Sequence, residues 1–317
     1  METLSSQLTA VGFDVFTYSS KKNKLFRFLN MLWGVLSKGA KAHTILIDTY
    51  STQNFYYAVA VANLCRLFGW SYIPILHGGN LPERLQKNKF LSHRLFHGAK
   101  TNITPSQYLM EAFKAKGYHN LTYIPNTIVV KDYSFLLRNK INPRLLWVRS
   151  FAEIYNPMLA LKLVEKLMPR YPNITLCMIG PEKDGSQQKC MEYAKNHNLP
   201  VTFTGKLSKE AWRKKSTDFD IFINTTNFDN TPVSLIEAMA LGLPVVSTNV
   251  GGIPYLVEDR KDGILVPVDN VQSFEKAIAE LCTDNELAQT LTINARKKAE
   301  DFDWENVKQH WLSLLKE

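Results

Sequence analysis

Two acidic residues, Asp229 and Glu237, lie eight positions apart in NTTNFDNTPVSLIEAMALGLPVVSTNVGG, residues 224–252. Glu237 stands among apolar residues of a predicted helix, for which Thr231 is the expected N-cap and Pro232 the first helical residue. A buried carboxylate without a partner is costly, so we expect Glu237 to be paired with a hydroxyl or a cation. Ribose hydroxyls would suit it.

The start of this helix can also bind an anion. Its first N–H groups have no partners within the helix, and the helix dipole adds partial positive charge there. We therefore expect the backbone at Thr231 to bind a phosphate, beside the loop that carries Asp229.

The segment resembles the E-x7-E signature of the retaining glycosyltransferases of family 4 (glycosyl transferases group 1), with Asp229 in the first position and Glu237 in the second. The continuation EAMALGLPVVSTNVGG matches the family's EAMA-x-G-x-PVV and glycine pair almost residue for residue. The resemblance implies an α/β protein of the GT-B fold, with two Rossmann-like domains whose parallel sheets face a central crevice. It also implies metal-independent transfer of a hexose from a nucleotide diphospho-sugar donor to a glycan or lipid-linked acceptor, in bacterial-type surface polysaccharide synthesis.

The resemblance assigns roles to three residues in the sugar transfer itself. Asp229 would hold hydroxyls of the donor sugar, and Glu237 would bind the ribose. His77 follows the predicted strand SYIPIL in a context like the family's PI-x-x-HG, and it would contact the transferred sugar. No catalytic base is expected, because in this fold the departing phosphate is commonly proposed to take the proton of the acceptor.

Arg149 is predicted to end the first strand of the second domain, and it matches the family's Arg that neutralises the donor pyrophosphate. A guanidinium binds phosphate with two parallel hydrogen bonds and keeps its charge. The family's Lys, about five residues later, is not matched, because Tyr155 and Asn156 stand there.

The resemblance places the nucleobase near two strand ends, at Gly180 and at Thr204, Gly205 and Lys206. It implies neither a cofactor nor a metal, since the transfer needs no metal-binding D-x-D.

Strands that alternate with helices predict βαβ units and parallel sheets, whose ligands bind beyond the carboxyl ends of the strands. We predict a strand at FDVFTY (13–18), an N-terminal domain over 1–140 and a nucleotide-sugar-binding domain over 141–300. The polar, unpatterned residues 127–143 are predicted to form the linker. By resemblance, the helix in 301–317 packs back towards the N-terminal domain.

The beginning of the chain departs from the family pattern. A GT-B chain normally opens with an apolar strand and a glycine-bearing loop, followed by a helix that leads to a G-H-x-V-type sequence. Gly12-Phe13-Asp14-Val15 occupies that last place, yet only 11 residues precede it. We expect that the first strand and its loop are missing, and that Met1 is an internal Met of a longer reading frame.

Charge is distributed unevenly. Residues 1–100 contain 12 Lys and Arg against 4 Asp and Glu, whereas residues 101–317 contain 26 against 25. This imbalance favours an anionic partner. No nucleic-acid-binding motif is present, so anionic lipid or a phosphate-bearing acceptor is expected instead of nucleic acid. Four scattered cysteines, no secretory signal and no long apolar run predict a cytoplasmic protein with reduced thiols.

The segment KKNKLFRFLNMLWGVLSKGAK (21–41) predicts a basic amphipathic helix with an aromatic-bearing apolar stripe. Two interpretations are open. The helix anchors the protein peripherally on an anionic membrane surface, or it is a Rossmann helix with a large buried face.

Two other functions compete with hexosyl transfer. One is a catalytically weak or dead relative that only binds nucleotide-sugar, which the absent Lys and the Asp at position 229 suggest. The other is a sugar-nucleotide epimerase on the same fold, which the EAMALGLPVVS segment disfavours.

Overall fold

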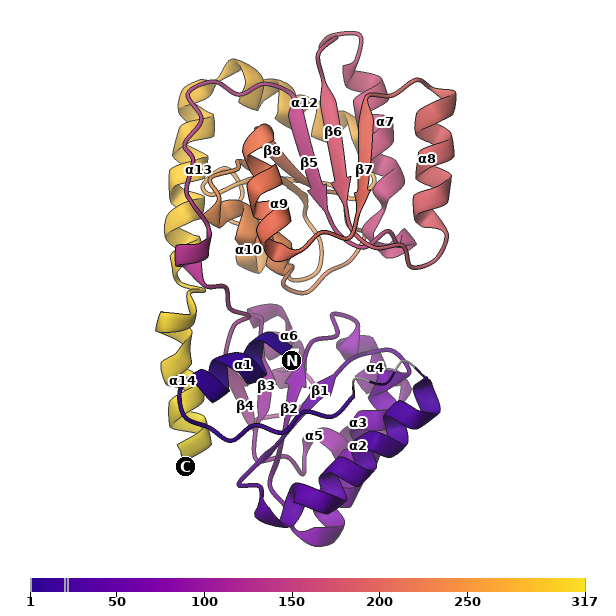
Figure 1. The fold of residues 1–317 in the computed structure, drawn as a ribbon, viewed down its shortest axis with the longest axis vertical. Coiled ribbons are helices and arrows are strands. Elements are labelled where there is room, and N and C mark those ends of the chain that lie inside the picture. Colours follow the sequence, from indigo (N-terminus) through magenta and orange to yellow (C-terminus); the bar gives the residue numbers. More distant parts are fainter. Residues whose placement is uncertain (1, 20, 22, 317) are drawn as a thin grey trace. The chain divides into compact units, whose positions relative to one another are not determined.

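The computed structural model describes residues 2–19, 21 and 23–316. The chain forms two compact units (Figure 1): an N-terminal unit of Met1–Ile124 with Trp311–Glu317, and a C-terminal unit of Pro125–His310. Each unit contains one parallel sheet. The α/β architecture with two Rossmann-like domains is therefore as predicted.

The N-terminal unit has strands of apolar residues separated by helices. Its elements are α1 (Glu2–Ala10), α2 (Lys24–Lys38), η1 (Gly39–Lys41), β1 (Ile45–Thr49), α3 (Asn54–Phe68), β2 (Tyr72–Leu76), α4 (Leu81–Lys87), α5 (Lys89–Phe96), β3 (Asn102–Thr104), α6 (Gln107–Lys114) and β4 (Leu121–Tyr123). The strand order is β1-β2-β3-β4. One apolar core, which includes Phe55, Phe96 and Phe113, joins the helices to this sheet.

The predicted strand at 13–18 is wrong. The described residues 13–19 form neither a strand nor a helix, and Phe13 N–H donates to the Leu8 carbonyl at the end of α1. The alternating pattern of FDVFTY does not correspond to a half-buried strand, since the Phe16 side chain is 61% exposed.

The C-terminal unit follows the predicted alternation closely. Its elements are η2 (Val130–Asp132), β5 (Arg144–Val148), η3 (Glu153–Tyr155), α7 (Pro157–Leu167), β6 (Thr175–Ile179), α8 (Ser186–Asn196), β7 (Val201–Gly205), α9 (Lys209–Lys215), η4 (Ser216–Asp218), β8 (Ile221–Asn224), α10 (Val233–Ala240), β9 (Val245–Thr248), α11 (Ile253–Leu256), β10 (Ile264–Val266), α12 (Val271–Thr283) and α13 (Asn285–Glu300). The last helix, α14, spans Trp304–Lys316, and its residues from Trp311 onward group with the N-terminal unit.

The C-terminal sheet has the order β10-β9-β8-β5-β6-β7 and is covered on both faces. One apolar layer contains α7, α8 and α12, and the other contains α9 and α10, as Figure 1 shows for α7 to α10. Successive residues of β5 alternate between the layers: Leu145 and Trp147 face one, Leu146 the other. Strands buried on both faces are nearly continuous apolar runs, which is why these strands could be found in the sequence.

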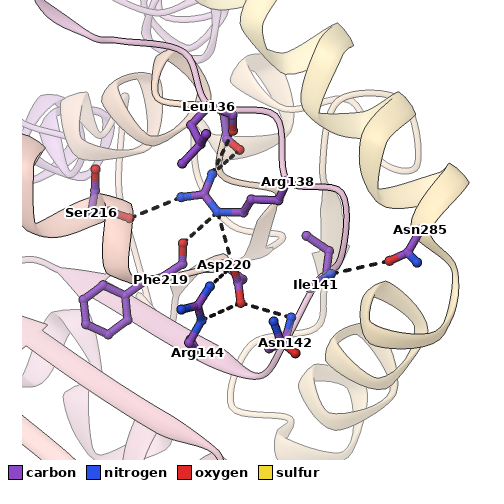
Figure 2. A network of polar contacts seen from close by, with 10 residues as sticks. Leu136, Arg138, Ile141, Asn142, Arg144, Ser216, Phe219, Asp220 and Asn285 are labelled. Carbon is purple, nitrogen blue, oxygen red and sulfur yellow. Dashed lines mark hydrogen bonds and ion pairs between the residues drawn. The ribbon is translucent and has the colours of Figure 1, made fainter.

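Residues 127–143 are not the exposed linker that their composition suggested. Ile128, Val130 and Tyr133 are buried in the core of the C-terminal unit. Further along, Arg138 donates hydrogen bonds to the carbonyls of Leu136, Ser216 and Phe219 (Figure 2). It also donates to the carbonyl of Gly242. The boundary between the units therefore lies after Ile124, before the predicted position at residue 140.

In this same region Asp220 is a buried carboxylate, 1% exposed, with two cationic partners. Arg144 donates two hydrogen bonds of 2.7 Å to the Asp220 carboxylate, and Arg138 Nε lies 3.4 Å from Asp220 Oδ1 (Figure 2). The backbone N–H of Asn142 adds a third donor at 3.0 Å. These contacts fix residues 138–144 to the segment that leads into β8.

All four cysteines are free, and Cys65, Cys177 and Cys190 are buried, as predicted. Among the described residues, no helix combines the length and the apolar composition needed to cross a membrane.

Candidate functional site

The predicted site residues of the C-terminal unit gather where its strand order reverses. β5 is the first strand of the sheet in the sequence; β6 and β7 follow on one side, and β8, β9 and β10 lie on the other. Ligands of such sheets bind at this switch point, beyond the carboxyl ends of the strands. Arg149 directly follows β5, and the loop with Asp229 follows its neighbour β8.

Arg149 forms an ion pair with Asp229 through Nη2 and Oδ2. Its guanidinium also lies over the ring of Tyr155, 4.1 Å from the ring centroid. Burial lowers the pKa of the Arg149 guanidinium, and Tyr155 opposes this shift. The Nε atom is buried and finds no acceptor among the described residues, so this cation has a donor left for a ligand.

Tyr155 stands in the region where the Lys of the resembling family was expected, and it supplies no positive charge. It stacks on Arg149 instead and keeps the guanidinium plane in place. Behind it, Thr225 Oγ1 donates to the Tyr155 carbonyl at 3.0 Å and accepts from Trp147 Nε1 at 3.0 Å. The loops after β5 and β8 are thereby joined.

Glu237 lies on α10 and is 2% exposed. The Tyr133 hydroxyl donates to its Oε1 at 2.6 Å, and Lys209, the first residue of α9, forms an ion pair with the same oxygen. Burial and the adjacent carboxylate raise the pKa of Tyr133 well above its ordinary value, so the phenol stays a donor. The prediction that Glu237 needs a hydroxyl or cationic partner is confirmed, and it has both.

The glycine pair after β9 allows two loops to touch. A Cβ on Gly251 would lie 2.1 Å from the Asp229 carbonyl oxygen, and one on Gly252 would lie 2.0 Å from that of Asn230. The Gly252 N–H donates to the Asp229 carbonyl at 3.0 Å. Only residues without a side chain allow this approach, which holds the backbone of Asp229.

The predicted cap of the adjacent helix is wrong by one residue. α10 begins at Val233, and Pro232 is its N-cap with φ −68° and ψ 114°, so Thr231 does not cap the helix. The Thr231 carbonyl instead accepts from Asn126 Nδ2 at 3.2 Å. Since Pro232 has extended dihedral angles, the first free N–H groups of the helix begin at Val233.

The residues predicted for the nucleobase lie together at the ends of β6 and β7. The Gly180 N–H donates to the Gly205 carbonyl at 3.0 Å, and Thr204 Oγ1 donates to the same carbonyl at 3.0 Å. A Cβ on Gly180 would lie 1.7 Å from the Arg149 carbonyl oxygen, so this glycine also allows β6 to pass close to Arg149. Lys206 is exposed just beyond.

His77 belongs to the N-terminal unit, where it follows β2. Its Nε2 lies 2.8 Å from Oδ1 of Asp48 on the neighbouring β1, and its ring stacks on Tyr50. Burial and the Asp48 charge raise the pKa of Tyr50 to about 12. The carboxylate orients the imidazole and fixes which nitrogen carries the proton.

Four neighbours of the predicted residues were missed: Asp48, Tyr133, Tyr155 and Lys209. Asp48 could have been found, because it lies at the carboxyl end of β1, the strand before that of His77, and parallel neighbours end at the same edge of a sheet. Tyr133 and Lys209 come from segments that no spacing rule connects to Glu237. Within the described part of the chain, no cluster of three or more His, Cys, Asp or Glu could hold a metal ion.

The solved structures that this chain resembles support the fold. Sucrose-phosphate synthase from Thermosynechococcus elongatus has a TM-score of 0.80 at 19% identity, covering 99% of this chain and 91% of that one. HepE from Anabaena, in complex with UDP and glucose, has a TM-score of 0.78 at 20% identity, covering 99% and 88%. These neighbours identify the architecture as GT-B.

Sequence relatives match over shorter segments. An uncharacterized glycosyltransferase of Haemophilus influenzae is 26% identical over 192 residues, 60% of this chain and 53% of that protein. The putative colanic acid biosynthesis glycosyltransferase WcaL of Salmonella typhimurium is 38% identical over 106 residues, 31% and 26% of the two chains. The chain thus spans about half, or less, of the length of these curated relatives.

The family model of glycosyl transferases group 1 matches residues 134–298, which include Arg149, Asp229, Glu237 and the glycine pair. That match covers more than half of the chain. The protein belongs to the glycosyl transferases group 1 family.

Proposed function

We propose that this chain is a retaining glycosyltransferase of family 4. It moves a hexose from a nucleotide diphospho-sugar to a glycan or lipid-linked acceptor in the synthesis of a bacterial-type surface polysaccharide. The observation that carries the proposal is the partly buried Arg149 at the switch point of the sheet, paired with Asp229 and with its buried Nε still open to an acceptor. A cytoplasmic location is part of the proposal, and the free thiols favour it.

Arg149 is the cation that binds the donor diphosphate. Its charge is held in a mostly desolvated position, where an ion pair with phosphate is strong. The first N–H groups of α10, beyond Thr231, add partial positive charge from the helix dipole. Phosphate oxygens would take the open Nε and compete with Asp229 for the remaining N–H groups.

Asp229 and Glu237 then hold hydroxyls. When phosphate occupies Arg149, the Asp229 carboxylate is released to accept hydroxyls of the donor sugar. Glu237 binds the ribose in exchange for Lys209, whose side chain is 61% exposed and can swing away. His77 contacts the transferred sugar, and Gly180, Thr204, Gly205 and Lys206 lie beside the nucleobase.

The chemical step builds negative charge on the leaving phosphate while the sugar becomes oxocarbenium-like. Stabilising that charge is the main task of the protein, and Arg149 with the α10 N-terminus performs it. The departing phosphate takes the proton of the acceptor hydroxyl, so the step needs neither a protein base nor a metal. Because Tyr155 brings no charge, Arg149 contributes a larger share of this stabilisation than an Arg that acts together with a Lys.

The comparisons support parts of this proposal. HepE was solved with UDP and with UDP-glucose, which favours a nucleotide-sugar donor of that class. The putative role of WcaL in colanic acid biosynthesis favours a surface polysaccharide as the product.

The test is incubation of the purified chain with UDP-, GDP- and ADP-sugars, with release of nucleoside diphosphate as the readout. We expect one donor class to be turned over, and turnover to fall in Arg149→Ala. A sugar nucleotide that is converted into its epimer without release of diphosphate would show an epimerase instead. Release that is equal in Arg149→Ala and in the parent would contradict the site.

A second candidate is a relative that binds nucleotide-sugar without transferring it. The observation in its favour is that the cations at the site are engaged by carboxylates, Arg149 by Asp229 and Lys209 by Glu237, while Tyr155 replaces the expected Lys. Calorimetry with the same nucleotides separates the two. Binding without any diphosphate release would favour this candidate.

A further inference from the structure

The outward face of α2 is apolar, although α2 is packed on the N-terminal unit. Leu25, Phe26, Leu29, Trp33 and Leu36 are exposed by 63, 64, 51, 61 and 51%. They recur at helical spacing and form a single stripe, which we call the α2 stripe. Contiguous apolar surface on a protein marks a binding surface more often than scattered exposed residues do.

The packing of the helix is done by its other side. Phe28 stacks on Tyr57 of α3 with 5.2 Å between ring centroids, and Met31, Leu32 and Val35 pack against the core of the unit. The helix therefore already has its buried face, and the α2 stripe is additional to it. The interpretation as an ordinary Rossmann helix explains the inner side alone.

The charges around the stripe have one sign. Lys21, Lys24 and Arg27 lie at its N-terminal end, and Lys38 and Lys41 at its C-terminal end. The sequence between Asp14 and Asp48 contains no Asp or Glu. Among the described residues, none of these five cations forms an ion pair with a carboxylate: Lys24 Nζ binds Gln53 Oε1, and Arg27 Nε binds the Lys21 carbonyl.

We propose that the α2 stripe docks onto an anionic phospholipid membrane. Leu, Phe and Trp side chains suit the boundary between headgroups and acyl chains, and cations at both ends of the helix meet the negative surface. A second copy of this chain fits less well, because two α2 stripes packed together would bring the cations of both copies close to each other without a carboxylate between them. The charge pattern thus selects lipid as the occupant.

The test is flotation of the full chain with phosphatidylcholine vesicles that contain or lack phosphatidylglycerol, at low and high salt. We expect binding to the anionic vesicles only, and at least a ~10-fold weaker partition at high salt, because salt screens surface charge. No donor or acceptor is present, so the outcome does not depend on glycosyl transfer.

Two sets of variants separate the apolar from the electrostatic contribution. Leu29→Glu with Trp33→Glu places two negative charges within the α2 stripe. Its matched control, Met191→Glu with Ile293→Glu, changes two exposed apolar residues of the C-terminal unit. We expect release from vesicles in the first pair and parental binding in the second, with parental circular dichroism in both.

The cations have their own matched pair. Replacing Lys21, Lys24, Arg27, Lys38 and Lys41 by Gln should reduce binding to anionic vesicles at least ~10-fold, by loss of attraction to the charged surface. Replacing five exposed lysines of the C-terminal unit by Gln, Lys183, Lys189, Lys195, Lys276 and Lys297, should leave binding unchanged.

Three outcomes would overturn the proposal. The parent chain could fail to float with anionic vesicles, or the stripe variant could float as well as its control. The third outcome combines two results: the parent chain does not bind vesicles, and sedimentation shows a dimer that Leu29→Glu with Trp33→Glu dissociates. The α2 stripe would then be the interface with a second copy of the chain.

Discussion

The ion pair between Arg149 and Asp229 joins the residue that directly follows β5 to the loop that follows the neighbouring strand β8. We predict that Asp229→Asn lowers the rate of transfer at least ~10-fold, since an amide neither pairs with the guanidinium nor accepts sugar hydroxyls as strongly. The measurement is kcat/KM for the donor identified in the panel. Asp218→Asn, an exposed acid paired with Lys215, is the control and should leave the rate unchanged.

At Glu237 the question is whether the buried carboxylate binds ligand or only holds Tyr133 and Lys209. We predict that Glu237→Gln raises the donor KM or lowers kcat so that kcat/KM falls at least ~10-fold. Glutamine can still accept from Tyr133, so the melting temperature should change little. Unaltered kinetics together with a lowered melting temperature would leave Glu237 with a structural role only.

Asp48 tests the geometry around His77 in the N-terminal unit. Burial and, to a smaller extent, the Asp48 charge raise the pKa of Tyr50 to about 12. Asp48→Asn removes the charge and should lower this pKa, which should nevertheless stay above 10 because burial remains. Tyrosine-labelled NMR titration measures it, and an unmoved resonance would place Asp48 away from Tyr50 and His77.

At the residue scale, the spacing of residues in the sequence predicts some contacts of the site and not others. Asp229 and Glu237 lie on one continuous loop and helix, so their spacing in the sequence largely determines how they lie relative to each other in space. Tyr133 and Lys209 approach Glu237 from segments 104 and 28 positions away. That Glu237 needs such partners was predictable from the cost of burying a charge, but which residues provide them depends on the tertiary fold.

At the scale of elements, glycines set how close the loops of the site come. We predict that Gly252→Ala lowers the free energy of unfolding by roughly 1–3 kcal/mol and also reduces transfer, because the new Cβ would push the Asn230 carbonyl and move Asp229. Gly252 has φ −87°, so this effect is steric and not one of backbone strain. Urea unfolding and kcat/KM measure the two consequences.

Gly185→Ala is the matched control. It has φ +88° and nothing within 4 Å of the added Cβ, so its cost is strain of roughly 1 kcal/mol, without an effect on transfer. Equal losses of activity in both variants would contradict the steric argument.

Helices and strands were predictable where local chemistry decides them. α3 ends at Gly69 in the left-handed conformation, and the doubly buried strands of the C-terminal sheet are apolar runs. The failure at 13–18 has the opposite cause: an alternating pattern requires a partner strand and a core on one side, and neither is encoded within six residues. α10 begins one residue later than predicted, because Pro232 has extended dihedral angles.

At the scale of the whole molecule, the polar composition of residues 127–143 led to the prediction of a linker, whereas the segment is part of the C-terminal unit. Composition does not distinguish polar residues that face water from those whose hydrogen bonds are made inside the protein. Arg138 is only 8% exposed and binds backbone carbonyls, so the segment is polar and yet built into the C-terminal unit. The two-unit organisation itself was predictable, since length and the repeated βαβ pattern both indicate it.

Arg138 therefore provides a test of whether this segment contributes to the stability of the C-terminal unit. We predict that Arg138→Met lowers the free energy of unfolding by about 2–4 kcal/mol, because the carbonyls it binds lose their donor and the buried Asp220 keeps only Arg144 as a cation (Figure 2). Urea unfolding of the full chain measures the loss. Arg260→Met is the control: its side chain is 55% exposed and pairs with Glu280 at the surface, so it should cost less than about 1 kcal/mol. If the free energy of unfolding fell by the same small amount in both variants, residues 127–143 would contribute little to the stability of the C-terminal unit. They would then be better described as a linker, with the boundary near residue 140.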